Sequence, residues 1–324
     1  MNKVFLWIVA VLVVLAGAAY GGRIYAKRTM TTRALTPGTL GATTPANVGV
    51  PFSRVAITSG ERTLIGWLVR APADSGTSAP ALLFLHGNNS AISDYVNLQR
   101  FLYRQGITSL VFDYSGFGAS GGAPSLTNAV EDAGRVAKVF ADSAGVGART
   151  VAMGSALGAT VLLQAIDSVQ PHVSGIVIEG VDASVLESAV RAGHVPAYLS
   201  RVVEDIADNV QAAARVRVPV LAIHSYEDNR TPIADAQRVM AAVSSRASLV
   251  RHWRKGHSAL LTSTRPCDWA PVLTFVKTGA LPPLAFDTTN ACAVEAAPMA
   301  TASARADSVQ LPVTPAGSTS TRPR

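Results

Sequence analysis

The sequence predicts a single α/β domain built on a mostly parallel sheet with helices on both faces. Short apolar runs alternate with helical stretches along a body of about 240 residues, a normal size for one such domain. The runs are apolar throughout, which is typical of strands that are buried on both faces. In addition, 48% of the residues are apolar and 15% are charged, a balance that supports a sizeable core and excludes a disordered body.

The expected elements follow one another in a regular order. Strands are predicted at 55–58, 64–70, 81–85, 108–113, 150–153, 175–178, 218–224 and 249–253. Helical patterns separate the later strands, at 93–104, 126–141, 157–168, 181–215 and 232–243. In a sheet of this type the chemistry gathers at the carboxyl ends of the strands. The loops that follow the strands are therefore the candidate site.

Two segments of low complexity flank this body. Residues 29–50 are rich in Thr, Pro and Gly without a periodic apolar face, which predicts a linker. Residues 293–324 are mainly Ala, Ser, Thr and Pro, which predicts a disordered tail. We accordingly expect an N-terminal hydrophobic segment at 1–28 and the α/β domain at 51–292.

The N-terminal segment has the length of a membrane span. Residues 4–22 carry no charge, and nineteen residues at about 1.5 Å each give about 28 Å, close to the hydrocarbon thickness of a bilayer. We interpret the segment as a single-pass signal anchor. A cleaved signal peptide is the alternative, because a shorter apolar run at 4–15 is followed by the small residues Ala16, Gly17 and Ala18.

The charge distribution bears on partners and location. The net charge of +7 comes largely from residues 1–33, which hold no acid and five basic residues: Lys3, Arg23, Lys27, Arg28 and Arg33. Basic charge beside a hydrophobic segment, rather than on the folded body, favours a membrane as partner and argues against nucleic acid. The positive-inside rule would hold the body in the cytoplasm. Cys267 and Cys292 are instead compatible with a disulfide, which favours the periplasmic or extracytoplasmic side, although two free thiols are the alternative.

The first two loops that follow buried strands contain glycine turns. After the strand at 81–85 comes the sequence His86-Gly87-Asn88-Asn89. A glycine turn at this place can aim backbone N–H groups into a site, as an oxyanion hole requires. His86 by itself is more often a structural residue. The glycines of the next loop, at 113–120, allow sharp turns, and we interpret that loop as architectural.

The loop after the strand at 150–153 has the spacing of a nucleophile elbow. The pattern G-x-S-x-G needs small residues two before and two after the nucleophile, because the strand-to-helix turn leaves no room for side chains there. Gly154 and Gly158 satisfy this spacing only around Ala156. A serine is present one position early, at Ser155. The sequence therefore has an alanine where a catalytic serine would stand.

Two later loops supply an acid and a histidine. Asp228 follows the strand at 218–224, where a triad acid would orient a histidine, although a lone Asp in a loop is also a common turn former or helix cap. His257 follows the last strand in the sequence Gly256-His257-Ser258. The chain order of elbow, acid and histidine is the order that α/β-hydrolases use.

Taken together, these loops resemble the α/β-hydrolase superfamily, and within it the membrane-anchored group of serine aminopeptidase-like hydrolases. That group has the motifs HGN, D-Y-x-G-x-G-x-S, G-x-S-L-G, H-G-x-x-D and G-H in this order. The corresponding residues here lie at 86–88, 113–120, 154–158, 224–228 and 256–257, and the similarity spans about residues 52–280.

The resemblance implies an α/β-hydrolase fold and a role for each matching residue. It makes Asp228 the triad acid, His257 the base, and the backbone N–H groups of Asn88 and Leu157 the oxyanion-hole donors. It also implies that residues 181–215 form a small helical cap over the site. The nucleophile position falls on Ala156, and there the pattern fails.

Three interpretations of the function stay open. Without a hydroxyl at Ala156 the chain would be a degenerate or very weakly active ester or acyl hydrolase, or a membrane protein that binds a small acyl ligand, a peptide or a partner without catalysis. Alternatively, Ser155 acts as the nucleophile in a remodelled elbow. In the third interpretation Asp228 and His257 activate water directly. The sequence has no P-loop, dinucleotide fingerprint or metal-ligand spacing, so we expect no cofactor and no metal.

Overall fold

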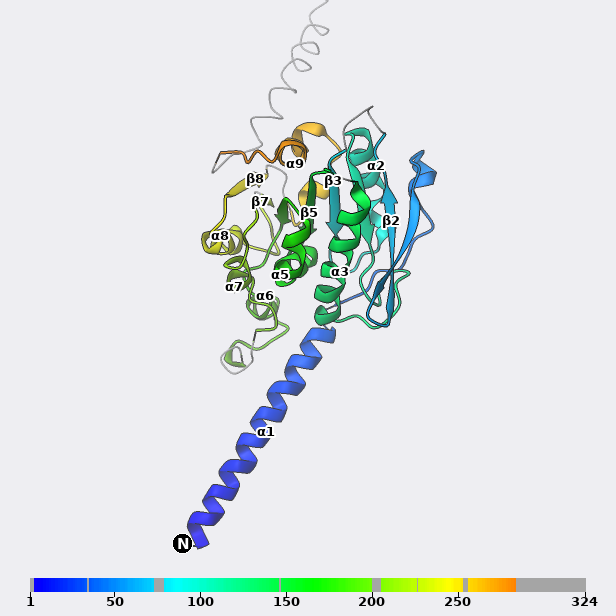
Figure 1. Cartoon of the computed structure of the whole chain (residues 1–324). Coiled ribbons are helices and arrows are strands. Elements are labelled where there is room, and N and C mark those ends of the chain that lie inside the picture. Colours follow the sequence, from blue (N-terminus) through cyan, green and yellow to red (C-terminus); the bar gives the residue numbers. More distant parts are fainter. Residues whose placement is uncertain are drawn as a thin grey trace, which may run out of the picture.

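The computed structural model describes residues 3–33, 35–72, 79–145, 147–199, 205–225, 227–252 and 256–283. A long N-terminal helix, α1 (Lys3–Arg33), projects from a body in which helices flank one sheet (Figure 1). The sheet has eight strands in the order β1-β2-β4-β3-β5-β6-β7-β8. The predicted fold class, with its mostly parallel sheet and helices on both faces, is confirmed.

The sheet opens with an antiparallel hairpin and continues with parallel strands. β1 pairs with β2, and β2 pairs with β4, in antiparallel register, whereas all later pairs are parallel. Every residue of the five central parallel strands is buried, which explains why they are apolar throughout. The strands are β1 (Ser53–Ser59), β2 (Arg62–Val69), β3 (Ala81–Leu85), β4 (Thr108–Phe112), β5 (Thr150–Ser155), β6 (Gly175–Glu179), β7 (Val220–Ser225) and β8 (Ala247–His252).

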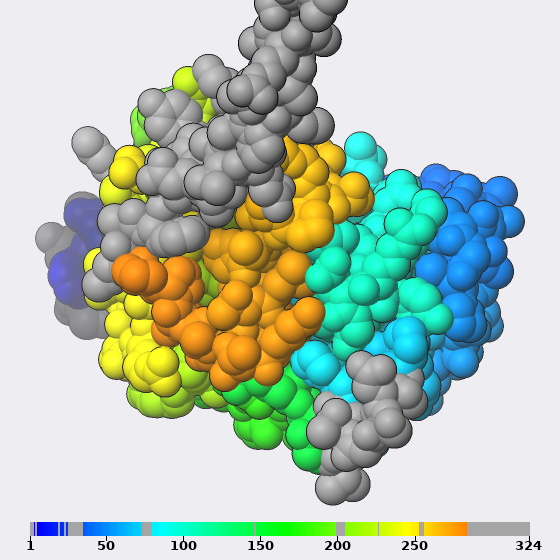
Figure 2. Space-filling model, turned by 90° about the horizontal axis from the view of Figure 1, so that it is seen from above, coloured from blue at the N-terminus to red at the C-terminus, as the bar shows by residue number. Residues whose placement is uncertain are grey.

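Two helical layers cover the sheet, and alternate strand residues face each layer. Leu83 and Leu85 of β3 pack into the core with α3 (Leu126–Ala144), α4 (Leu157–Gln164), α5 (Ile166–Val169) and α8 (Ile233–Ala242). Leu82 and Phe84 pack on the opposite face with α2 (Val96–Arg104) and α9 (Pro266–Thr278). Figure 2 shows α2 and α9, teal and orange, side by side on the surface, and the rings of Phe101 and Trp269 join them at 5.4 Å between centroids.

Within its described residues, the stretch expected as a cap contains three short helices. They are α6 (Val185–Arg191), the 3-10 helix η4 (Ala197–Leu199) and α7 (Asn209–Ala213), which follow β6 and precede β7. Ser184 caps α6 by accepting the Glu187 N–H, and Asp208 caps α7 by accepting the Gln211 N–H. This stretch therefore begins after the carboxyl end of a central strand, β6.

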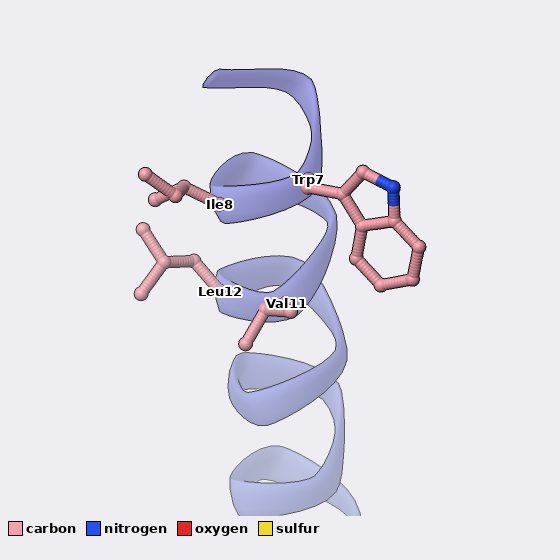
Figure 3. A pocket seen from close by; sticks show the side chains of 4 residues that line it. All are labelled: Trp7, Ile8, Val11 and Leu12. Carbon is pink, nitrogen blue, oxygen red and sulfur yellow. The ribbon is translucent and has the colours of Figure 1, made fainter. Parts of the chain in front are cut away.

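The first part of α1 is apolar on all sides. Its window Phe5–Gly22 has a mean hydropathy of 2.2 and is 0% buried by the rest of the molecule. Ile8 and Leu12 project from one side of the helix and Trp7 from another, with Val11 between them (Figure 3). A helix without a polar face suits a lipid environment better than a protein surface. By length and composition α1 could anchor in a membrane.

The chain that follows α1 is packed against the body, although its composition predicts a linker. The helix itself continues to Arg33, and Leu35, Pro45 and Val50 are buried. The segment 35–41, which we call the docked segment, is held mainly through backbone groups. Contacts of this kind need no apolar periodicity, which is why the sequence pattern did not indicate them.

One predicted covalent feature lies partly outside the described residues. Cys267 is buried at the start of α9. Cys292 lies outside the described residues, as does the tail expected at 293–324. The Cys267–Cys292 disulfide therefore stays a prediction.

Candidate active site

The elbow is a strained turn centred on Ala156. This residue joins β5 to α4 with φ 52° and ψ −113°, and it is one of three non-glycine residues in the described chain with positive φ. A Cβ added to Gly154 would lie 2.3 Å from the carbonyl oxygen of Gly158, and one added to Gly158 would lie 2.0 Å from that of Leu85. Neither position has room for a Cβ, so both require glycine, in the register that the sequence predicts.

The loop expected to form an oxyanion hole lies against this elbow. A Cβ added to Gly87 would lie 3.9 Å from the Cβ of Ala156 and 3.7 Å from the carbonyl oxygen of Ser155. Asn88 is the next residue along this loop. Leu157 is the first residue of α4, so its N–H is one of the amides that a helix cannot satisfy internally. The fold thus brings the Asn88 and Leu157 loops together around Ala156.

Asp228 and His257 form a hydrogen-bonded pair. The Nδ1 of His257 lies 2.9 Å from the Oδ2 of Asp228, and the side chains are 16% and 1% exposed, respectively. The Oδ1 of Asp228 accepts the N–H groups of Arg230 and Thr231, each at 2.8 Å. Burial acts to raise the pKa of Asp228, but the hydrogen bonds from His257, Thr231 and Arg230 outweigh it and hold this pKa below its ordinary value. With Nδ1–H donated to an ionised carboxylate, the Nε2 of His257 is the basic nitrogen.

The end of β6 connects this pair to the elbow. The N–H of Ala156 donates to the carbonyl oxygen of Glu179 at 2.9 Å. At the next residue, Gly180, an added Cβ would lie 3.3 Å from the Cε1 of His257. Gly180 has φ 59° and no side chain, so the imidazole can pack directly against the backbone beside the elbow.

Ser155 is buried and lies one residue before the elbow position. It is the last residue of β5 and lies opposite Glu179 of β6. Its hydroxyl donates to the Oε2 of Glu179 at 2.9 Å, and its oxygen lies 2.9 Å from the hydroxyl oxygen of Ser258. Among the described residues its side-chain hydrogen-bond partners are thus Glu179 and Ser258, and neither Asp228 nor His257 is one of them.

The sequence patterns did not indicate Glu179 or Ser258 as site residues. Glu179 is 1% exposed, its Oε1 accepts the Leu260 N–H at 3.0 Å, and burial raises its pKa to about 7. The loop that carries His257 is thereby fastened to the end of β6. The available signal was a lone acid at the end of the apolar run Gly175–Glu179, but the predicted strand stopped one residue short of it.

Comparisons with known proteins agree with this arrangement. A family model described as serine aminopeptidase, S33, matches residues 76–181, and one described as TAP-like protein matches residues 200–292. The first range contains the loop that carries Asn88 and the elbow, and the second contains Asp228 and His257. Two separate stretches of the chain therefore match hydrolase family models, and the chain has the α/β-hydrolase fold.

Relatives of this chain include two proteins from Mycobacterium tuberculosis strains, each described as uncharacterised. They are 32% identical over 181 residues, which is 55% of this chain and 62% of theirs. The match therefore spans less than two thirds of the length of these relatives.

Solved structures share the fold. An esterase from Pyrococcus furiosus has a TM-score of 0.61 at 19% identity, covering 75% of this chain and 98% of that one. For an acylaminoacyl peptidase the TM-score is 0.58 at 16% identity, and the match covers 75% of this chain and 44% of the peptidase. For acetyl xylan esterase 1 from Thermoanaerobacterium the TM-score is 0.54 at 15% identity, and the match covers 70% of this chain and 85% of the esterase.

Two further polar residues of the sequence motifs, His86 and Asp113, contact backbone groups of the loops around the elbow. His86 is fully buried, its Nδ1 lies 2.8 Å from the carbonyl oxygen of Gly87, and burial lowers its pKa to about 4. Asp113 is also fully buried and accepts the N–H groups of Ile92 at 2.9 Å and Ala119 at 3.1 Å. Burial raises the pKa of Asp113 to about 6. Within the described ranges, no group of three or more His, Cys, Asp or Glu side chains is placed to hold a metal ion.

Proposed function

We propose that this α/β-hydrolase is a degenerate or very weakly active ester or acyl hydrolase that binds its ligand at the elbow without forming an acyl-enzyme. The observation that carries the proposal is Ala156 in the strained turn, with φ 52°, between two glycines that admit no side chain. Alanine offers no hydroxyl for covalent catalysis. Loss of a triad serine typically removes about six orders of magnitude in kcat.

The contacts of Ser155 weigh against its use as a replacement nucleophile. Its hydroxyl is engaged with the Glu179 carboxylate, and the residue is 1% exposed. A nucleophile needs a base that accepts its proton and an open path to the substrate carbonyl. To meet His257, the end of β5 would have to turn its side chain out of the buried cluster and give up the hydrogen bond with Glu179.

A second candidate function is weak hydrolysis by an activated water. The hydrogen bond of 2.9 Å between Asp228 and His257 supports it, because the pair has the geometry of a general base. His257 is 16% exposed, so water can reach the imidazole. The absent serine hydroxyl would leave room for such a water beside Ala156.

We also infer that α1 is a single-pass membrane anchor, with the α/β body on the extracytoplasmic side. The uncharged window Phe5–Gly22 supports the anchor, and the cysteine pair supports the side. The full-length chain should stay with membranes after carbonate extraction. A mature protein that begins at Ala19 or Tyr20, identified by mass spectrometry, would instead establish a cleaved signal peptide.

Ester hydrolysis tests the proposed function. The wild-type protein should hydrolyse short p-nitrophenyl esters barely above background. Ala156→Ser should raise kcat by at least a hundredfold, and His257→Ala in that background should remove the gain because the introduced hydroxyl loses its base. If the small wild-type rate falls with His257→Ala, the water route is supported. A robust wild-type rate that disappears with Ser155→Ala would contradict the proposal.

A further inference from the structure

The membrane-directed helix joins the body next to the oxyanion loop. The N–H of Thr36 donates to the Oδ1 of Asn88 at 2.7 Å, and the N–H of Asn89 donates to the carbonyl oxygen of Thr36 at 2.8 Å. α1 ends at Arg33, three residues before Thr36. Three residues span at most about 11 Å, so the end of α1 lies close to the loop that carries Asn88.

The docked segment is also fastened to the neighbouring loops. The N–H of Gly118 donates to the carbonyl oxygen of Gly38 at 3.1 Å, and the N–H of Gly41 donates to the Oγ of Ser93 at 2.8 Å. Three contact points on loops that follow β3 and β4 leave the segment little freedom. The attachment of α1 therefore has a defined position relative to the elbow.

The carboxyl ends of the strands face the side of the body from which α1 leaves. α3 begins at Leu126, after the loop that follows β4, and α1 contacts α3. In Figure 1 the start of α3, the cap helix α6 and the end of α1 all lie at the lower end of the body. The elbow, the oxyanion loop and the cap thus share this end.

Exposed apolar side chains point to the same end. Outside α1, the large hydrophobic side chains that the described chain exposes are Leu40 at 37% and Tyr198 at 76%. Leu40 belongs to the docked segment and Tyr198 to η4 of the cap. An exposed tyrosine is typical of the headgroup level of a membrane, where its ring is apolar and its hydroxyl is hydrated.

The distance to the bilayer is short. The eleven helical residues 23–33 follow the apolar window and extend about 16 Å, of which a headgroup layer takes about 5–8 Å. The body is therefore held within about 10 Å of the headgroups, and the four basic residues of this stretch would attract anionic lipid.

We propose that the candidate active site opens toward the membrane surface and that its ligand is an amphiphilic acyl ester that enters from the lipid phase. In this orientation Leu40 and Tyr198 contact the headgroup region at the end of the body that carries the elbow, and the cap receives the apolar chain of the ligand. The acyl chemistry rests on the proposed function, whereas the orientation rests on the docked segment and on α1 staying attached.

Site-directed fluorescence tests the orientation without any catalysis. Full-length Leu40→Cys and Tyr198→Cys would carry an environment-sensitive nitrobenzoxadiazole label, in vesicles of phosphatidylcholine and phosphatidylglycerol. Ala241→Cys is the matched control, because Ala241 is exposed near the end of α8, at the amino edge of the sheet. The unsubstituted chain sets the labelling background.

The labels at positions 40 and 198 should both show blue-shifted emission and at least twofold quenching by a nitroxide on the lipid near the headgroup, while Ala241→Cys shows neither. Equal, water-like emission at all three positions would overturn the proposed orientation.

Hydrolysis by Ala156→Ser tests the ligand class. A long-chain p-nitrophenyl ester would be placed either in the vesicles that hold the protein or in separate vesicles, with soluble p-nitrophenyl acetate as the reference. The ester in the same vesicles should be cleaved at least tenfold faster than the ester in separate ones. Cleavage of the acetate with equal rates for the two vesicle arrangements would overturn the ligand class alone. No cleavage of the acetate would contradict the proposed function, and the fluorescence result would still decide the orientation.

Discussion

The hydroxyl of Ser155 donates a hydrogen bond of 2.9 Å to the carboxylate of Glu179 on the neighbouring strand. Both residues are 1% exposed, and the second carboxylate oxygen of Glu179 accepts the Leu260 N–H at 3.0 Å. The serine beside the elbow therefore helps to fasten the ends of β5 and β6 to η5 (Ala259–Thr262), which follows His257. This arrangement assigns Ser155 a structural contribution and separates it from the position of a nucleophile.

Ser155→Ala should lower the stability of the fold and leave the chemistry unchanged. Removing one hydrogen-bond donor from a buried carboxyl group lowers the free energy of unfolding by about 1–3 kcal/mol, which urea unfolding can measure. Ser245→Ala is a suitable control, since its hydroxyl donates at 2.7 Å to the carbonyl oxygen of Val218 in a half-buried place and its loss should cost about 1 kcal/mol or less. In the Ala156→Ser background, Ser155→Ala should keep the restored ester hydrolysis in the fraction that is folded. Loss of that activity in the folded fraction would contradict the structural contribution.

Glu179 should make stability depend on pH. Burial raises its pKa from 4.5 to about 7, so the folded state disfavours the ionised form. The contribution of Glu179 to the free energy of unfolding is fully present below about pH 4.5 and is lost as the pH rises to about 7. The change is on the order of 3 kcal/mol. Glu179→Gln cannot ionise, so the stability of the wild type relative to this variant should fall between pH 4.5 and 8. Parallel pH profiles of the two unfolding free energies would show that Glu179 has no raised pKa.

Gly38 should be essential for docking of segment 35–41. A Cβ at Gly38 would lie 2.3 Å from the backbone carbon of Ser90, where nothing can move aside easily, whereas one at Gly41 would meet only the Ser93 side chain at 3.2 Å. Gly38→Ala should therefore release the segment, and Gly41→Ala should retain it. Hydrogen exchange with mass spectrometry should show the segment's amides exchanging at least tenfold faster in Gly38→Ala than in Gly41→Ala or the wild type. Unchanged protection in Gly38→Ala would exclude tight docking.

The predicted Cys267–Cys292 disulfide should be detectable in protein taken from its native compartment. A loop of this length would stabilise the fold by about 3–4 kcal/mol if the bond is unstrained. Peptide mapping without reduction should recover the two cysteine peptides as one linked species. Two free thiols would remove the disulfide and also weaken the extracytoplasmic placement.

The fold and the elbow register could be predicted because they depend on local rules. Runs that are apolar throughout indicate buried parallel strands, and the strand expected at 81–85 coincides with β3. The glycine spacing singles out Ala156, and the structure shows why, since neither Gly154 nor Gly158 has room for a Cβ. The order of the loops likewise anticipated that Asp228 and His257 would meet.

Other features depend on contacts that leave no pattern in the sequence. Glu179 is one acid after four apolar residues, and only the register of β5 and β6 places it opposite Ser155. The docked segment is bound through backbone amides and through glycines that permit close approach, so its Thr, Pro and Gly content resembles that of a linker. The position of α1 beside the oxyanion loop follows from those contacts alone.

The central claim is that Ala156 occupies an otherwise prepared nucleophile position, and covalent labelling by a fluorophosphonate tests it most directly. The reagent reacts with a serine that a neighbouring base activates. The wild-type protein should take no label, whereas Ala156→Ser should take one equivalent at position 156, and His257→Ala in that background should abolish it. Labelling of the wild type at Ser155, or an Ala156→Ser protein that folds normally and stays unlabelled, would contradict the claim.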